Sequence, residues 1–178
     1  GTGTGKITFD GAAATIESGA TNNFHHFEIN TTADKTVITN DLDIDGDFTI
    51  IQGTFDPGAF SHDIAGNWDD SGGSFTGGTG TITMSSVATK TVKTGINNKF
   101  NNLTIDGTIE TFSDNDIEIE GILDVNASKT LTVAAGDQLT FTGNSSAHTI
   151  DGILNVNTSS GTSSTLDFTG STNNTVVV

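Results

Sequence analysis

Short segments in which apolar and polar residues alternate recur along the whole chain. Residues 6–9 (KITF), 48–50 (FTI) and 131–133 (LTV) are examples, and Gly or Asn follows most such segments within a few positions. Successive side chains of a β-strand point to opposite faces, so each segment has one apolar and one polar face. Glycine and asparagine accept the positive φ of tight turns. The pattern therefore predicts an all-β chain of short strands joined by turns.

The chain also repeats itself at an offset of 75 or 76 residues. The matching pairs are residues 3–9 with 78–84, 15–19 with 91–95, 22–29 with 98–105, and 40–46 with 115–121. A shorter match relates residues 121–126 to 152–157. We therefore expect a single domain over 1–178, with repeat units at approximately 3–77 and 78–152 and a partial third unit at 153–178.

Within each unit the alternating segments return about every 18–20 residues, and each resembles the one before it. This is typical of a solenoid, in which every coil packs on its neighbours. The sequence thus predicts a parallel β-solenoid (β-helix) of about nine coils of roughly 18–20 residues. A β-sandwich is the alternative fold, but its long-range pairing would need dissimilar segments.

Four segments carry a resemblance to a known kind of protein. They are residues 3–11 (GTGKITFDG), 41–50 (DLDIDGDFTI), 66–68 (GNW) and 100–105 (FNNLTI). These resemble the tandem units of long, secreted bacterial surface proteins of the adhesin-like kind, whose repeats are parallel β-helices. The resemblance implies that fold and a role at the cell surface, but no activity, because those repeats share no catalytic motif. Calcium-binding nonapeptide repeats fit less well, since Ile82 stands where their motif needs an Asp ligand.

Composition narrows the range of partners. The 178 residues include 6 Lys, no Arg and 22 acidic residues, and the formal net charge is −16. Neutralising phosphates requires Lys and Arg, so neither nucleic acid nor an anionic membrane is an expected partner. The chain has no Cys, which excludes disulfides and thiolate zinc sites. No apolar run approaches the roughly 20 residues of a membrane-spanning helix.

One acidic segment suggests a weak calcium site. Residues 41–47 (DLDIDGD) imitate the start of a calcium-binding loop, although Gln52 at its twelfth position cannot supply a bidentate carboxylate. Alternation places Leu42 and Ile44 inward and the acids outward, and the matching acids of the second unit are outward too. The candidate ligands for surface Ca²⁺ are Asp41, Asp43, Asp45, Asp116, Glu118 and Glu120.

The histidines are not expected to bind metal. His25 and His26 are neighbours in a predicted strand, so their rings should point to opposite faces. The second unit has Asn at residues 101–102, so the position favours a polar side chain rather than a ligand. His62 and His148 are isolated. Apart from weakly bound Ca²⁺, no cofactor is expected.

An enzyme is not expected either. Acid–base catalysis needs a positioned pair of groups, and the acids at 69–70 and 114–116 are expected to be solvated in loops. A module that binds or acts on neutral glycans stays the alternative. An ice-binding solenoid is a minor one, because Thr-x-Thr pairs are frequent but do not recur in every coil. Trp68 is expected in the core or at its rim, and the Asn pairs at 22–23, 97–98 and 101–102 are expected to bond the turns.

The expected function is structural or adhesive. Solenoids that exist as soluble monomers carry atypical end repeats that cover the core. Here residues 1–10 already belong to the repeat, and residues 174–178 (NTVVV) carry no charge or Pro that would block strand pairing. We expect end-to-end stacking, either as a homopolymer or with flanking repeats of a longer chain. An extracellular or cell-surface location is expected, with any export signal removed or outside this chain.

Overall fold

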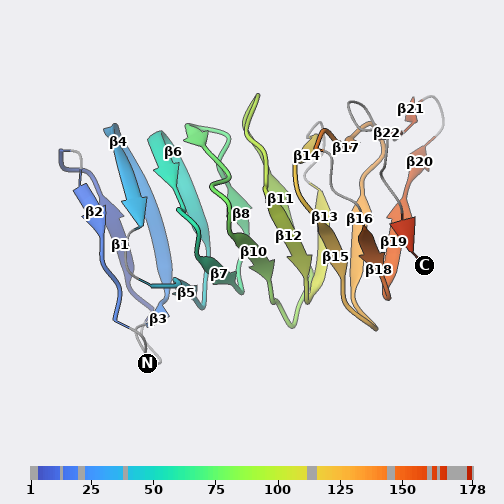
Figure 1. Cartoon of the computed structure of the whole chain (residues 1–178), viewed down its shortest axis with the longest axis horizontal. Coiled ribbons are helices and arrows are strands. Elements are labelled where there is room, and N and C mark those ends of the chain that lie inside the picture. Colours follow the sequence, from blue (N-terminus) through green and yellow to red (C-terminus); the bar gives the residue numbers. More distant parts are fainter. Residues whose placement is uncertain are drawn as a thin grey trace.

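The computed structural model describes residues 4–12, 14–19, 23–37, 40–111, 116–143, 147–159, 162–163, 165–167 and 176–177. Their regular structure consists of strands that stack side by side along the longest axis (Figure 1). No helix in this part of the chain is long and apolar enough to cross a membrane. The all-β prediction is confirmed.

Three faces surround the core. The first face follows β1 (Lys6–Phe9), β4 (His26–Val37), β6 (Phe48–Asp56), β8 (Trp68–Asp69), β11 (Lys90–Lys93), β13 (Thr108–Thr111), β16 (Thr130–Val133) and β19 (Ile153–Val156). The second follows β3 (Asn23–Phe24), β5 (Asp43–Ile44), β7 (Ser61–Ile64), β10 (Thr81–Met84), β12 (Asn102–Ile105), β15 (Leu123–Val125), β18 (His148–Ile150) and β23 (Val176–Val177). The third contains β14 (Ile117–Ile119), β17 (Gln138–Phe141) and β22 (Thr165–Asp167).

Two long strands lead from the first face into the third. The first half of β6 pairs with β8 and its second half with β9 (Ser74–Phe75); β2 (Ala14–Ile16) pairs in the same way with the second half of β4. Phe75 contacts Phe100, which bridges to Ile119 of β14, so β9 continues into the third face. The chain therefore visits the second, first and third faces in turn.

Every described strand pair between coils is parallel, which confirms the parallel β-solenoid. The single antiparallel pair among the described strands is the short hairpin of β20 (Thr158–Ser159) and β21 (Thr162–Ser163).

The predicted number of about nine coils is too high, whereas the predicted coil length of roughly 18–20 residues holds for several coils and is exceeded in others. Each of the two long faces has eight strands among the described residues, which therefore form fewer than nine coils. Paired residues are 20 positions apart between Phe48 and Trp68, but 24 between Trp68 and Val92 and 28 between His148 and Val176. Longer loops at the corners, such as residues 85–89, lengthen individual coils. Alternation within strands does not indicate loop length.

The 75-residue repeat does not return to the same face. Strand β1 of the first face matches β10 of the second, and β5 of the second face matches β14 of the third. From β1 the chain passes the first face again at β4, β6 and β8, then the third face at β9, before it reaches β10. One repeat therefore spans three complete coils and two of the three faces of the next coil. Successive repeat units are therefore related by a rotation about the solenoid axis combined with a shift along it. The three faces allow this because strands on each face alternate apolar inward and polar outward side chains in the same way.

Inward residues form a continuous core. Phe27, Phe48 and Trp68 lie at the same position of consecutive coils, with ring centroids 5.8 Å and 4.3 Å apart. Trp68 is 1% exposed, which confirms its predicted place in the core. At some corners the coils approach so closely that only glycine fits. A Cβ on Gly66 would lie 2.2 Å from the Gly46 carbonyl.

Candidate functional site: coil seams, grooves and the end of the stack

Side chains at the corners accept backbone hydrogen bonds from the next coil. His26 Nδ1 accepts from the Asp47 N–H at 2.9 Å, Asp47 Oδ1 from the Asn67 N–H at 2.8 Å, and Asn67 Oδ1 from the Thr91 N–H at 3.0 Å. These contacts form a ladder along one corner, which we call the corner ladder. In the second unit Asn102 Oδ1 accepts from the Ile122 N–H at 2.9 Å, as the repeat mate of His26. A polar acceptor, not a metal ligand, is what this position requires.

The predicted orientation of the two adjacent histidines is wrong. The rings of His25 and His26 lie edge to face with centroids 4.4 Å apart. His25 lies at a bend between β3 and β4 rather than within a strand, so the alternation of a strand does not apply to it. Three members of the Asn pairs, Asn98, Asn101 and Asn102, bond neighbouring turns as predicted, whereas Asn22 lies outside the described residues. Asn101 Nδ2 donates to the Gly80 carbonyl at 3.2 Å, for example.

One acid predicted to be solvated is buried. Asp70 is 0% exposed, and its Oδ1 accepts from the Gly95 N–H at 2.6 Å. Asn98, also buried, donates to the Asp70 carbonyl at 3.0 Å and accepts from the Phe75 N–H at 3.0 Å. Burial raises the pKa of Asp70 to about 6. Asp70 and Asn98 thus fasten the loop at 94–98 to the preceding coil. The predicted cluster at 114–116 lies mostly outside the described residues.

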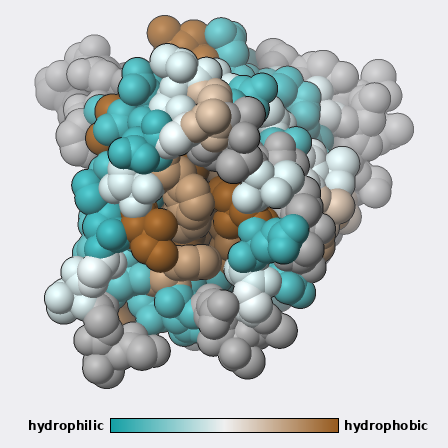
Figure 2. Space-filling model, turned by 90° about the vertical axis from the view of Figure 1, so that its left-hand side faces the viewer, coloured by the Kyte–Doolittle hydropathy of each residue, from teal (hydrophilic) through white to brown (hydrophobic). Residues whose placement is uncertain are grey.

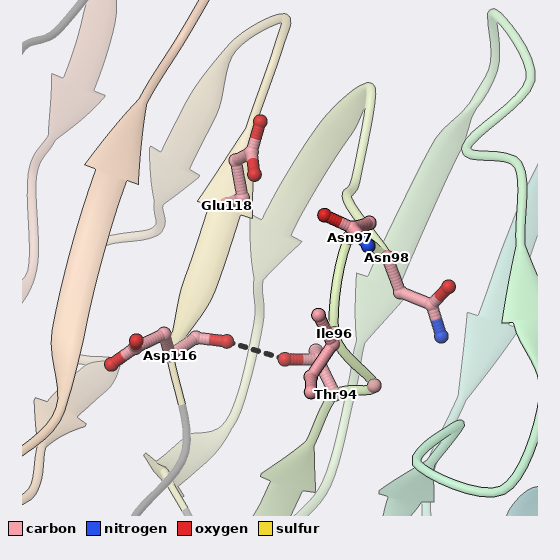
Figure 3. A pocket seen from close by; sticks show the side chains of 7 residues that line it. Thr94, Ile96, Asn97, Asn98, Asp116 and Glu118 are labelled. Carbon is pink, nitrogen blue, oxygen red and sulfur yellow. Dashed lines mark hydrogen bonds between the residues drawn. The ribbon is translucent and has the colours of Figure 1, made fainter.

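A shallow groove of about 260 Å³ lies beside that loop (Figure 3). Residues 94–98 form one side, and Asp116 and Glu118 of the next coil form the other. The Thr94 hydroxyl donates to the Asp116 carbonyl, and Glu118 accepts from the Thr142 hydroxyl at 3.0 Å. The Glu118 carboxylate is therefore held by a contact within the fold, and the Asp116 carboxylate is held by the Gln138 N–H.

A second groove of about 280 Å³ crosses the first face over β6, β8 and β11. Asp47 and Asn67 line it, but both belong to the corner ladder. Trp68 lies beneath it and is buried, so it offers no ring face for stacking on a sugar. Nothing in this groove favours the glycan alternative.

The six candidate calcium ligands lie on two different faces. Asp43 lies in β5 of the second face, with Asp41 and Asp45 beside this strand. Glu118 lies in β14 of the third face, with Asp116 and Glu120 beside that strand.

Several of these acids have structural contacts. Asp41 Oδ1 accepts from the Ser61 N–H at 2.9 Å, and Asp116 Oδ1 from the Gln138 N–H at 2.7 Å. Burial raises the pKa of Asp43, as do the charges of Asp45 and Asp63. The described residues contain no group of three or more His, Asp or Glu that could hold a metal ion. Surface Ca²⁺ stays a prediction that calorimetry would test.

The Thr pairs do not form one flat array. Thr81 and Thr83 are on the second face, whereas Thr140 is on the third. On the first face Thr91 pairs with Glu110, which pairs with Thr132. A regular threonine lattice, as an ice surface would need, is not assembled by these strands.

The end of the stack near β1 exposes apolar side chains. Figure 2 views this end and shows apolar surface near its centre. Ile7 is 41% exposed, and Phe9 and Phe24 are only partly buried against the core. Among the described strands, β1 and β3 have a partner on one side only. At the other end Ile153 is 52% exposed.

No protein-family model, curated protein or solved structure matches this chain. Its class is therefore defined by its own fold, and it is a parallel β-solenoid built from tandem repeats.

Proposed function

We propose that this chain is an extracellular structural and adhesive module that stacks end to end, with second copies of itself or with flanking coils of a longer fibre. The observation that carries the proposal is the open end at β1 and β3, where core side chains are exposed beside strand edges. Such an edge is a template for pairing with another strand. A head-to-tail contact of this kind produces open filaments rather than closed rings.

The inside of the stack supports the same conclusion. Parallel pairing joins successive coils along the stack, and the coils nearest the β1 end are also joined by aromatic contacts and by the corner ladder. A coil added at this end would find contacts of the same kind. Exposed acids such as Asp41, Asp43 and Asp45 lie on the side walls, and the formal net charge of the chain is −16. Repulsion between like-charged walls disfavours sideways association at low salt. Association of copies along the solenoid axis therefore stays possible when sideways association is disfavoured.

Sedimentation velocity over a range of concentrations tests the proposal. The wild-type chain is expected to form elongated oligomers whose size rises with concentration. Ile7→Lys, at the open end, should abolish them. Ile96→Lys is the matched control, because Ile96 is 93% exposed but lies on the side wall. A wild type that stays monomeric at every concentration, or equal behaviour of the two variants, would overturn end-to-end stacking.

A further inference from the structure

Two buried histidines connect successive coils in the same way, and we call the junction between two successive coils a coil seam. His62 of β7 and His148 of β18 are 2% and 1% exposed and lie on the second face, several coils apart. His62 Nδ1 accepts from the Leu42 N–H at 2.9 Å, and His148 Nδ1 accepts from the Leu123 N–H at 3.1 Å. In both cases the donor belongs to the preceding coil. A buried backbone N–H that loses its acceptor costs about 1–3 kcal/mol.

The hydrogen bonds of His62 define its protonation state. Since Nδ1 accepts a hydrogen bond, it carries no proton, and Nε2 carries the proton that it donates to the Pro57 carbonyl at 2.9 Å. A protonated imidazole has two N–H donors and no acceptor. Protonation of His62 would therefore place the new Nδ1–H donor opposite the Leu42 N–H donor, and the hydrogen bond between them would be lost.

The surroundings of His62 favour the neutral ring. It packs in the core with Leu42, Ile44, Phe55 and Ile82, which are apolar. Burial lowers the pKa of His62, while the Pro57 carbonyl and the nearby charge of Asp41 act in the opposite direction. Of the neighbouring strands, β5 carries Asp43 and β7 itself carries Asp63, and these two pair with each other across the seam.

His148 stands in a similar setting. Its ring packs on Phe141 with centroids 4.2 Å apart. The charged residues on the strands beside it are Asp124 of β15 and Asp151, which follows β18.

We propose that His62 and His148 are proton switches that loosen the coil seams at Leu42 and Leu123 in mildly acidic surroundings. This proposal concerns the fold itself and does not depend on end-to-end stacking. The chain provides its own comparison, because Asn102 replaces His26 at the matching position of the second unit and accepts the same kind of bond. Asn supplies an acceptor at a similar distance from the backbone but does not titrate. An asparagine in place of His62 would therefore keep an acceptor for the backbone N–H without a group that takes up a proton.

The direction of the pH effect follows from linkage. An unfolded or opened His62 has the ordinary pKa of about 6.5, and the closed ring has a lower one. The stabilising contribution is complete above pH 6.5 and is lost as the pH falls toward the lowered value of the closed state. Opening takes up one proton in this window, so its equilibrium constant rises by up to about tenfold per pH unit.

Amide hydrogen exchange of the wild-type chain, followed by NMR from pH 7 to 5, tests the proposal. After correction for intrinsic exchange, protection of the Leu42 amide should fall by up to about tenfold per pH unit below pH 6.5, and protection of the Leu123 amide should fall when His148 is protonated. The Thr91 amide is the internal control, since it bonds to Asn67, which does not titrate. His62→Asn should make protection of Leu42 independent of pH.

Equal changes in protection at Leu42 and Thr91 would overturn the proposal. So would an unchanged pH response of Leu42 in the His62→Asn variant. If that variant does not fold, the comparison of Leu42 with Thr91 in the wild type decides alone. Imidazole ¹⁵N shifts give a second measure, and a neutral ring protonated on Nδ1 at pH 7 would also contradict the proposal.

Discussion

Replacing the buried Asp70 by Asn should change the pH dependence of stability in a defined way. Burial raises the pKa of Asp70 to about 6, whereas an unfolded Asp titrates near 3.9. A raised pKa means that the folded state binds the proton more tightly. The stabilising contribution of Asp70 is therefore present at pH values below its pKa in the unfolded chain, and it is lost as the pH rises through about 6. At neutral pH the wild type keeps a carboxylate charge in its core.

The magnitude follows from the two pKa values. Between pH 4 and pH 7.5 the difference corresponds to roughly 2 kcal/mol, given about 1.4 kcal/mol for each pKa unit. Asn keeps an acceptor for the Gly95 N–H. It also places an amide where Asp70 Oδ2 has no hydrogen-bond partner among the described residues. The free energy of unfolding of Asp70→Asn minus that of the wild type should thus be about 2 kcal/mol larger at pH 7.5 than at pH 4.

Urea unfolding of both proteins at the two pH values measures this quantity. Other titrating groups, the histidines included, affect both proteins alike and cancel in the difference. Asp10→Asn, at an exposed acid, is the control and should show no such change. A difference for Asp70→Asn that stays constant within about 0.5 kcal/mol would refute the assignment of Asp70 as a buried acid that titrates near neutrality.

Three further predictions concern the packing of the coils. Trp68→Ala should lower the free energy of unfolding by about 3–5 kcal/mol in denaturant titrations, because it leaves a cavity in the aromatic stack, and a loss below 1 kcal/mol would contradict that packing. Gly66→Ala should lower the melting temperature strongly, because the added Cβ would meet the Gly46 carbonyl. Gly5→Ala is the control and should not lower it, because a Cβ there would meet nothing within 4 Å. Equal shifts in melting temperature for the two variants would contradict the close approach of the coils at Gly66. Thr83→Cys and Thr104→Cys, paired in adjacent strands, should oxidise to an intramolecular disulfide seen as a mobility shift, and a reduced monomer under oxidising conditions would argue against this register.

The sequence predicts inward positions well because they depend on local alternation. Leu42 and Ile44 are 1% exposed, as expected, and the acids beside them point outward. The same reasoning holds for Ile117 and Ile119 in the second unit. A parallel solenoid follows from such segments once their similarity is recognised.

The phase of the repeat could not be predicted, because it depends on the ratio of the repeat length to the coil length. Corner loops change the coil length without affecting the pattern inside strands. The match of β1 to β10 therefore indicates a repeat, but not that the two strands lie on different faces.

Residues at turns were predicted least well. Asp70 and His25 stand where strands end, so alternation gives no direction for their side chains. The buried state of Asp70 depends on Asn98 and Gly95 of the next coil, which are 28 and 25 positions away. A signal was present in His62, a polar residue at an inward position of residues 61–64, but its acceptor role needs the Leu42 amide of the preceding coil.

Electron cryomicroscopy of the purified chain at high concentration tests the central claim most directly. If the coils continue from one copy to the next, the images should show unbranched filaments of constant width. Their averaged power spectra should contain an axial spacing of about 4.8 Å, the distance between stacked strands. Discrete particles one chain in length at every concentration, without this spacing along a filament axis, would contradict the account.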